Sequence, residues 1–190
     1  MTTPVNLATQ ALIGIGAKPI SAFDDGSAEA EIAGALYDGV RDGLLSAYTW
    51  SFATGQVAPA RLAGTPLADY PYAFALPTDF LRAVSVGSGG RGRGVPYRVA
   101  RGALHARAES VVLTYIFRPE EAAFPPFFAQ ALIARLRAEL CIPLTENTDR
   151  AAAMAALADD AFGRARQVDA QQDTPKRIED WSLINARVGS

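Results

Sequence analysis

Cysteine and histidine are almost missing from this chain of 190 residues, which contains one of each, Cys141 and His105. A single cysteine cannot form a disulfide within the chain, and one cysteine with one histidine cannot build a zinc cluster. The composition therefore indicates a reducing compartment, and it predicts neither a bound metal nor a cofactor.

Long apolar runs are also missing. No stretch approaches the roughly 20 apolar residues that a membrane-spanning helix needs. Residues 1–17 carry no side-chain charge, but they lack a basic start and contain Asn6 and Gln10, so they make a poor signal peptide. We therefore expect no membrane partner.

The pattern of a catalytic centre is missing too. His105 stands in an expected strand without the nucleophile and orienting acid that a catalytic base needs, and no G-x-S-x-G elbow occurs. The acidic pairs at 24–25, 120–121 and 159–160 consist of adjacent residues, which do not face the same way on a helix. We therefore expect no catalytic residue and no enzyme activity.

One glycine-rich motif resembles a cofactor site only formally. Residues 87–92, "GSGGRG", match G-x-G-x-x-G after a strand-like segment. A dinucleotide site needs a helix to begin there, because the helix N-terminus binds the pyrophosphate. Pro96 and the β-like sequence around it argue against that helix. We interpret the motif as a mobile hairpin tip.

Four segments show helical periodicity. In the second of them Ile32, Leu36, Val40 and Leu44 recur at every fourth residue. The same segment contains three glycines that each cost about 1 kcal/mol in a helix interior, which predicts close approach of another helix or subunit. We expect helices near residues 4–15, 27–49, 125–142 and 148–168, with the third ended by Pro143, and glycines of close contact at Gly34, Gly39 and Gly43.

Between residues 51 and 119 the periodicity changes and turn signals interrupt the chain every few residues. Short strands are expected at 72–76, 82–86, 97–99, 104–107 and 111–117. The predicted fold class is α+β: mainly a helical bundle of about four helices, with an inserted β-rich segment and an extended C-terminal arm. The expected divisions are 1–50 and 120–170 for the helical bundle, 51–119 for the inserted segment and 171–190 for the arm.

Charge is divided unevenly along the chain. Residues 82–118 contain seven arginines against Glu109 alone, which gives this segment +6 in a chain of net charge −2. Such a segment is either a solubilising surface, a surface complementary to an acidic neighbouring subunit, or a site for nucleic acid, because arginine binds phosphate without reading sequence. Few aromatic residues stand among the arginines, which favours the first two readings.

The stretch "YPYAFALPTDFLR", residues 70–82, combines four aromatic residues and two prolines. Aromatic side chains bury a large area on few rotatable bonds, and proline fixes an extended path. We expect Tyr70, Tyr72 and Phe74 to join the helical body to the β-segment together with Trp50 and Phe52. In this interpretation the stretch is a stiff junction.

The order of several motifs points to a family. These are "NLATQALIGIGAKPISAFDD" (6–25), "RDGLLSAYTWSFAT" (41–54), the stretch 70–82, "LTYIFRPEEAAFPPFFAQALIARLRAEL" (113–140), "IPLTENTDR" (142–150) and "EDWSLINAR" (179–187). In this succession the chain resembles the head-to-tail adaptors of tailed bacteriophages, called tail tubular protein A in short-tailed phages. Related adaptors occur in siphophages and gene transfer agents.

The resemblance implies a structural virion protein. Its partners would be the portal protein, the next tail protein (a nozzle or stopper) and further copies of itself in a dodecameric ring. Such a ring binds the portal vertex, extends the DNA channel and carries the tail, so packaged double-stranded DNA is a further candidate partner. The expected location is the virion neck, after assembly in the bacterial host cytoplasm. The alternative is a nucleic-acid-binding protein acting through segment 82–118.

Two groups of residues are the candidate sites. The C-terminal arm has no clean periodicity and only isolated apolar anchors, which is typical of a segment that orders on a partner. We therefore assign portal binding to the arm and a tail-facing or DNA-facing role to the basic segment. The arm candidates are Trp181, Leu183, Ile184 and Arg187, and the basic candidates are Arg91, Arg93, Arg98 and Arg101.

Overall fold

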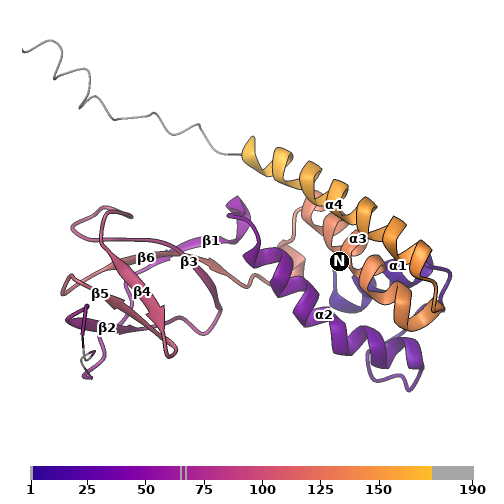
Figure 1. Ribbon diagram of the computed structural model, residues 1–190, viewed down its shortest axis with the longest axis horizontal. Coiled ribbons are helices and arrows are strands. Elements are labelled where there is room, and N and C mark those ends of the chain that lie inside the picture. The colour runs from indigo at the N-terminus through magenta and orange to yellow at the C-terminus, as the bar shows by residue number, and fades with distance from the viewer. Residues whose placement is uncertain (1, 65, 67, 173–190) are drawn as a thin grey trace, which may run out of the picture.

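The computed structural model describes residues 2–64, 66 and 68–172. This part of the chain has a mixed α+β fold with four α-helices and two small antiparallel sheets, and Figure 1 shows the helices at one end and the strands at the other. The elements are α1 (Pro4–Gly14), α2 (Ala28–Ser46), β1 (Thr54–Val57), β2 (Tyr72–Ala75), β3 (Phe80–Gly87), β4 (Tyr97–Ala100), β5 (Ala103–Ala106), β6 (Val112–Phe117), α3 (Pro126–Thr145) and α4 (Thr148–Ala170), with short 3₁₀ turns η1 (Ser51–Ala53) and η2 (Glu121–Ala123).

Side-chain caps begin three of the helices. The hydroxyls of Thr3 and Ser27 and the side-chain oxygen of Asn147 each accept a hydrogen bond from the backbone N–H three residues later, as a cap should. Threonine, serine and asparagine are among the residues preferred at this position, so these three helix starts follow from local sequence.

The end of α3 differs from the prediction. Pro143 does not end this helix but lies inside it, and the helix continues to Thr145. The backbone N–H of Glu146, which has a left-handed φ of 52°, donates to the carbonyl of Ile142 and closes the last turn. A proline lacks one donor and crowds the turn before it, but the N–H of Glu146 and the hydroxyl of Thr145 each donate to a carbonyl of the last turn, at Ile142 and Cys141.

The helical core is built around α3, which contacts α1, α2 and α4. Trp50 is fully buried at its strand-facing end and lies edge-on to Phe128 and Phe162, with ring centroids 5.1 and 5.7 Å away. Its indole N–H donates to the carbonyl of Leu44 at 3.1 Å. The aromatic ring thus gains packing while its one polar atom keeps a partner.

The strands form two sheets with the orders β1-β6-β3 and β2-β5-β4. Strand β6 alternates between two cores: Leu113 and Tyr115 belong to the core between the sheets, and Ile116 belongs to the helical core. The first sheet therefore packs against the helices on one face and against the second sheet on the other. The sequence prediction missed β1 and placed the start of β3 two residues too late.

The proposed aromatic junction is not present. Trp50 and Phe52 pack in the helical core, whereas Tyr72 and Phe74 pack in the core of the two sheets. The stretch 70–82 forms β2 and the start of β3, and residues 60–62 cover the free edge of β2, with Leu62 N–H donating to the carbonyl of Ala73. The composition correctly predicted that these aromatic residues are packed in a core, but it did not show that they belong to two different cores.

Candidate functional site

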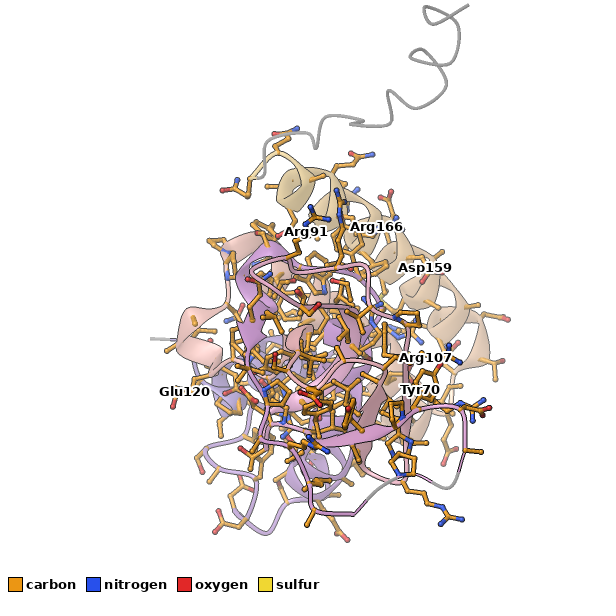
Figure 2. The ribbon with its side chains drawn as sticks, turned by 90° about the vertical axis from the view of Figure 1, so that its left-hand side faces the viewer. Tyr70, Arg91, Arg107, Glu120, Asp159 and Arg166 are labelled. Atoms are coloured by element: carbon orange, nitrogen blue, oxygen red, sulfur yellow. The ribbon has the colours of Figure 1, made fainter. Side chains whose placement is uncertain are left out.

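The arginines of the basic segment are spread over the β-strand end of the molecule. Figure 2, which faces this end, shows Arg91 well apart from Arg107. Arg98 lies 3.6 Å from Asp69, and Arg107 donates to the carbonyl of the same Asp69. Among the described residues none forms an ion pair with the exposed Arg91, Arg93 or Arg101. The four candidate arginines are thus exposed, and two of them, Arg93 and Arg98, line different clefts.

The glycine-rich loop 88–96 is not a hairpin tip. It connects β3 of one sheet to β4 of the other, because β3 pairs with β6 and β4 pairs with β5. The loop folds back closely: a Cβ on Gly87 would lie 1.8 Å from the carbonyl oxygen of Arg91, and the carbonyl of Gly92 accepts a bond from Ser85 at 2.9 Å. Only glycine permits this approach at position 87.

Arg101 occupies a strained position in the tight turn between β4 and β5. Arg101 and Gly102 both have positive φ, 51° and 70°, which is the backbone of a type I′ hairpin turn. Asparagine or glycine is favoured at the first of these positions, because a left-handed conformation strains most side chains. An arginine retained there is consistent with a contact role for this tip.

The substitution Arg101→Asn should therefore stabilise the isolated protein by about 0.5–1 kcal/mol, because Asn-Gly suits this turn. Urea unfolding of the variant and of wild type measures the difference. Arg91→Asn is the matched control: it removes an equally exposed arginine outside the positive-φ positions, and it should change stability little. An equal gain in both variants would show that charge removal, and not backbone strain, is responsible.

An ion-pair network joins α2 to the exit of β6. Arg41 is 2.9 Å from both Asp42 and Glu121, and Arg118 donates to Asp42 from two nitrogens, Nε and Nη2. Burial alone would raise the pKa of Asp42, but hydrogen bonds from Arg118 and Arg41 outweigh it and hold this pKa below its ordinary value. Burial and the nearby Glu121 raise the pKa of Tyr37, whose hydroxyl donates to Glu121. The network holds the segment between β6 and α3, where the chain returns from the strands to the helices, against α2.

The depressed pKa of Asp42 predicts a loss of stability in acid. Its folded pKa lies below the ordinary 3.8, so its stabilising contribution is fully present above that value and disappears as the pH falls through the folded pKa. Urea unfolding at about pH 5 and about pH 2.5 should show a smaller pH effect in Asp42→Asn than in wild type. Asp38→Asn, which removes an exposed ion pair to the same Arg41, should keep most of the wild-type effect.

A buried aspartate fixes the C-terminal end of α4. Asp169 is 3% exposed and accepts hydrogen bonds from the backbone N–H and the hydroxyl of Ser51, at 3.0 and 2.7 Å. Ser51 begins η1, so the carboxylate caps a short helix from a position 118 residues away. The last described residues therefore lie against the boundary between the helices and the strands.

Next to this contact lies a polar cleft of about 960 Å³ between the end of α4 and the first sheet. It is lined by hydroxyl-bearing and amide side chains, with Arg93 from the glycine-rich loop and Asp169 and Gln172 from the other side. Part of the basic loop thus lies beside the last described residues, which follow α4.

A second groove, of about 440 Å³, lies between α2 and α4 above α3. Gly39 and Gly43 line it, and a Cβ on either glycine would have no described atom within 4 Å, whereas one on Gly34 would touch Phe23 at 3.4 Å. Within the described part of the chain, Gly34 thus meets only Phe23 of the connector before α2, at ordinary contact distance, and none of the three glycines lies against another helix. Approach by another subunit remains an expectation for Gly39 and Gly43.

Gly39→Leu should leave the isolated protein at least as stable as wild type, by up to about 1 kcal/mol, because leucine is the better helix former and has room there. The same change should weaken assembly by filling the groove. Thermal unfolding and ring formation on the portal protein measure the two effects. Gly34→Leu is the contrast, and should destabilise the isolated chain through Phe23. A stabilised Gly39→Leu variant that assembles normally would show that this groove stays open in the assembly.

The single histidine lies within the second sheet. His105 lies on β5 between Ala73 of β2 and Arg98 of β4. Over the described ranges, no group of three His, Cys, Asp or Glu side chains is arranged to hold a metal ion. No described helix combines the length and the apolar character needed to cross a membrane.

The other predicted site lies outside the described residues: Trp181, Leu183, Ile184 and Arg187 all follow Gln172. Neither the contact between Asp169 and Ser51 nor the network at Arg41 could be predicted from the sequence, because both depend on residues far apart in the chain. Comparison with protein-family models gives no match for this chain, and comparison with the curated proteins gives none either.

Proposed function

We propose that this chain is a structural virion protein, a head-to-tail adaptor that binds the portal vertex as a ring and carries the tail. The proposal rests first on the succession of motifs from residue 6 to residue 187, which resembles that family in order and covers most of the chain. It includes the finer fold description, a helical bundle with an inserted β-rich segment and a C-terminal arm.

The observation that carries the proposal is the anchored end of α4. Asp169 holds the last turn of α4 on Ser51, so the arm leaves a rigid body at a fixed place. The arm that follows has isolated apolar anchors at Trp181, Leu183 and Ile184. A fixed origin restricts where an arm can reach, which lowers the entropy lost when it binds a partner.

The exposed arginines support a protein-facing role within the same proposal. Arg93 and Arg98 line different clefts, and Arg98 is paired with Asp69. A groove for DNA would follow the phosphate backbone with a continuous row of cations. We therefore favour an acidic protein surface as the partner of Arg91, Arg93, Arg98 and Arg101.

Mixing experiments separate the adaptor from the nucleic-acid-binding alternative. Light scattering after size exclusion should show a monomer or weak oligomer alone, and a ring bound to the portal when purified cognate portal protein is added. Mobility shift of double-stranded DNA at moderate salt, without portal, should show no complex. A DNA complex that weakens on changing all four exposed arginines to glutamine, with no portal binding, would replace the adaptor by the alternative.

A further inference from the structure

A cleft of about 480 Å³ opens where edge strand β3 of the first sheet passes edge strand β4 of the second. Its apolar lining comes from Phe80, Leu81, Tyr97 and Val99, of which Val99 is 40% exposed. β3 pairs irregularly with β6, with register shifts at both Arg82 and Ser85, so its outer edge is poorly shaped to accept a further strand. The cleft is suited to a side chain more than to a strand.

Two arginines border this cleft, and no carboxylate lines it. Arg82 donates to the hydroxyl of Thr49 at 3.2 Å, but its buried Nε has no hydrogen-bond partner among the described residues. Arg98 is 62% exposed and is only loosely paired with Asp69. A buried guanidinium nitrogen without a partner is costly, and a carboxylate is the group that best satisfies it. The cleft therefore fits an aromatic residue that is preceded or followed by acids.

The chain contains such a segment a few residues beyond Gln172 in the sequence. In residues 178–184, "IEDWSLI", Glu179 and Asp180 come directly before Trp181. The described part ends at Gln172, in the polar cleft that Thr49 and Val84 also line, and Thr49 is the partner of Arg82. Nine residues from Gln172 to Trp181 span up to about 30 Å, whereas Val84 and Phe80 are about 13 Å apart along β3. The indole can therefore reach the cleft of its own chain.

We propose that the chain's own C-terminal segment 178–184 docks in the β3–β4 cleft, with Trp181 on the apolar lining and Glu179 and Asp180 on Arg82 and Arg98. This contact goes beyond the adaptor function, because both partners belong to one chain and no portal is needed. Since the same residues are assigned to portal binding, the two contacts exclude each other. The cleft holds the arm until the portal takes it.

Disulfide trapping in the full-length chain tests the contact. The buried Cys141 is first changed to alanine, and Val99→Cys is combined with Ser182→Cys. The control combines Ser182→Cys with Gly43→Cys, which places the first cysteine in the α2–α4 groove. Under mild oxidation the first pair should form a disulfide within one chain about tenfold faster than the control, because docking raises the local concentration of the two thiols.

Charge reversal supplies the second measurement. Arg98→Glu should lower the trapping rate of the Val99/Ser182 pair, and Asp180→Arg added to it should restore the rate. Equal trapping in both cysteine pairs would overturn the proposal. Faster trapping at Gly43 would assign the arm to the other groove, and disulfides formed only between chains would assign it to a second copy. None of these results depends on portal binding, so failure here leaves the adaptor function to its own test.

Discussion

Removal of residues 173–190 should abolish ring assembly on the portal protein while the remainder stays folded and monomeric. The described body keeps both hydrophobic cores and the contact between Asp169 and Ser51 without this segment. What is lost is the portion with the apolar anchors Trp181, Leu183 and Ile184. Light scattering of the truncated chain with and without portal measures the effect.

Trp181→Ala isolates the largest anchor within the full-length chain. A buried tryptophan often dominates a protein interface and costs at least about 2 kcal/mol when truncated, which corresponds to a roughly 30-fold weaker complex. Val188→Ala, in the same segment but outside the assigned anchors, serves as the control and should bind nearly as wild type. A truncated chain that still forms rings on the portal would remove the arm from the interface.

Asp169→Ala should lower the free energy of unfolding by about 2–3 kcal/mol, because it leaves the backbone N–H and hydroxyl of Ser51 without their buried partner. The arm would also lose its fixed origin, so portal binding should weaken. Urea unfolding gives the first quantity and titration with portal the second.

Ser51→Ala is the matched variant for this contact. It removes the hydroxyl donor but keeps the backbone N–H on Asp169, so it should cost less, about 1 kcal/mol. The fall in unfolding free energy should be larger for Asp169→Ala than for Ser51→Ala. Equal stability of Asp169→Ala and wild type would mean that solvent replaces the carboxylate and that the carboxylate does not hold the end of α4.

Elements governed by neighbouring residues could be predicted from the sequence. The four-residue spacing of Ile32, Leu36, Val40 and Leu44 placed α2, and the caps at Thr3 and Ser27 marked helix starts within one residue. These signals depend on contacts between residues three or four apart, so the sequence displays them directly.

The pairing of the strands could not be predicted from the sequence. The loop 88–96 has the composition of a hairpin tip, yet it joins two sheets, because β3 finds its partner β6 and not β4. Strand β1 was missed because "TGQV" contains glycine and glutamine and owes its strand conformation to pairing with β6. Pairing over such distances in the chain depends on the whole fold.

For the candidate surfaces, exposure could be predicted from the sequence, but the arrangement of the residues could not. Exposure of Arg91, Arg93, Arg98 and Arg101 was expected from their charge, and the structure places all four on the surface. The different clefts that Arg93 and Arg98 line, and the network that fixes Arg118 on Asp42, follow from the whole fold and were not visible in the sequence. Charge counted along the chain therefore overstated how far the basic residues act together.

Electron microscopy of purified portal rings mixed with the full-length chain tests the central claim most directly. The account predicts one additional ring, coaxial with the portal and of matching dodecameric symmetry, with the arm of each copy in contact with the portal and the β-strand ends available to the next tail protein. Portal rings that remain bare, with the chain left free in the background, would contradict it.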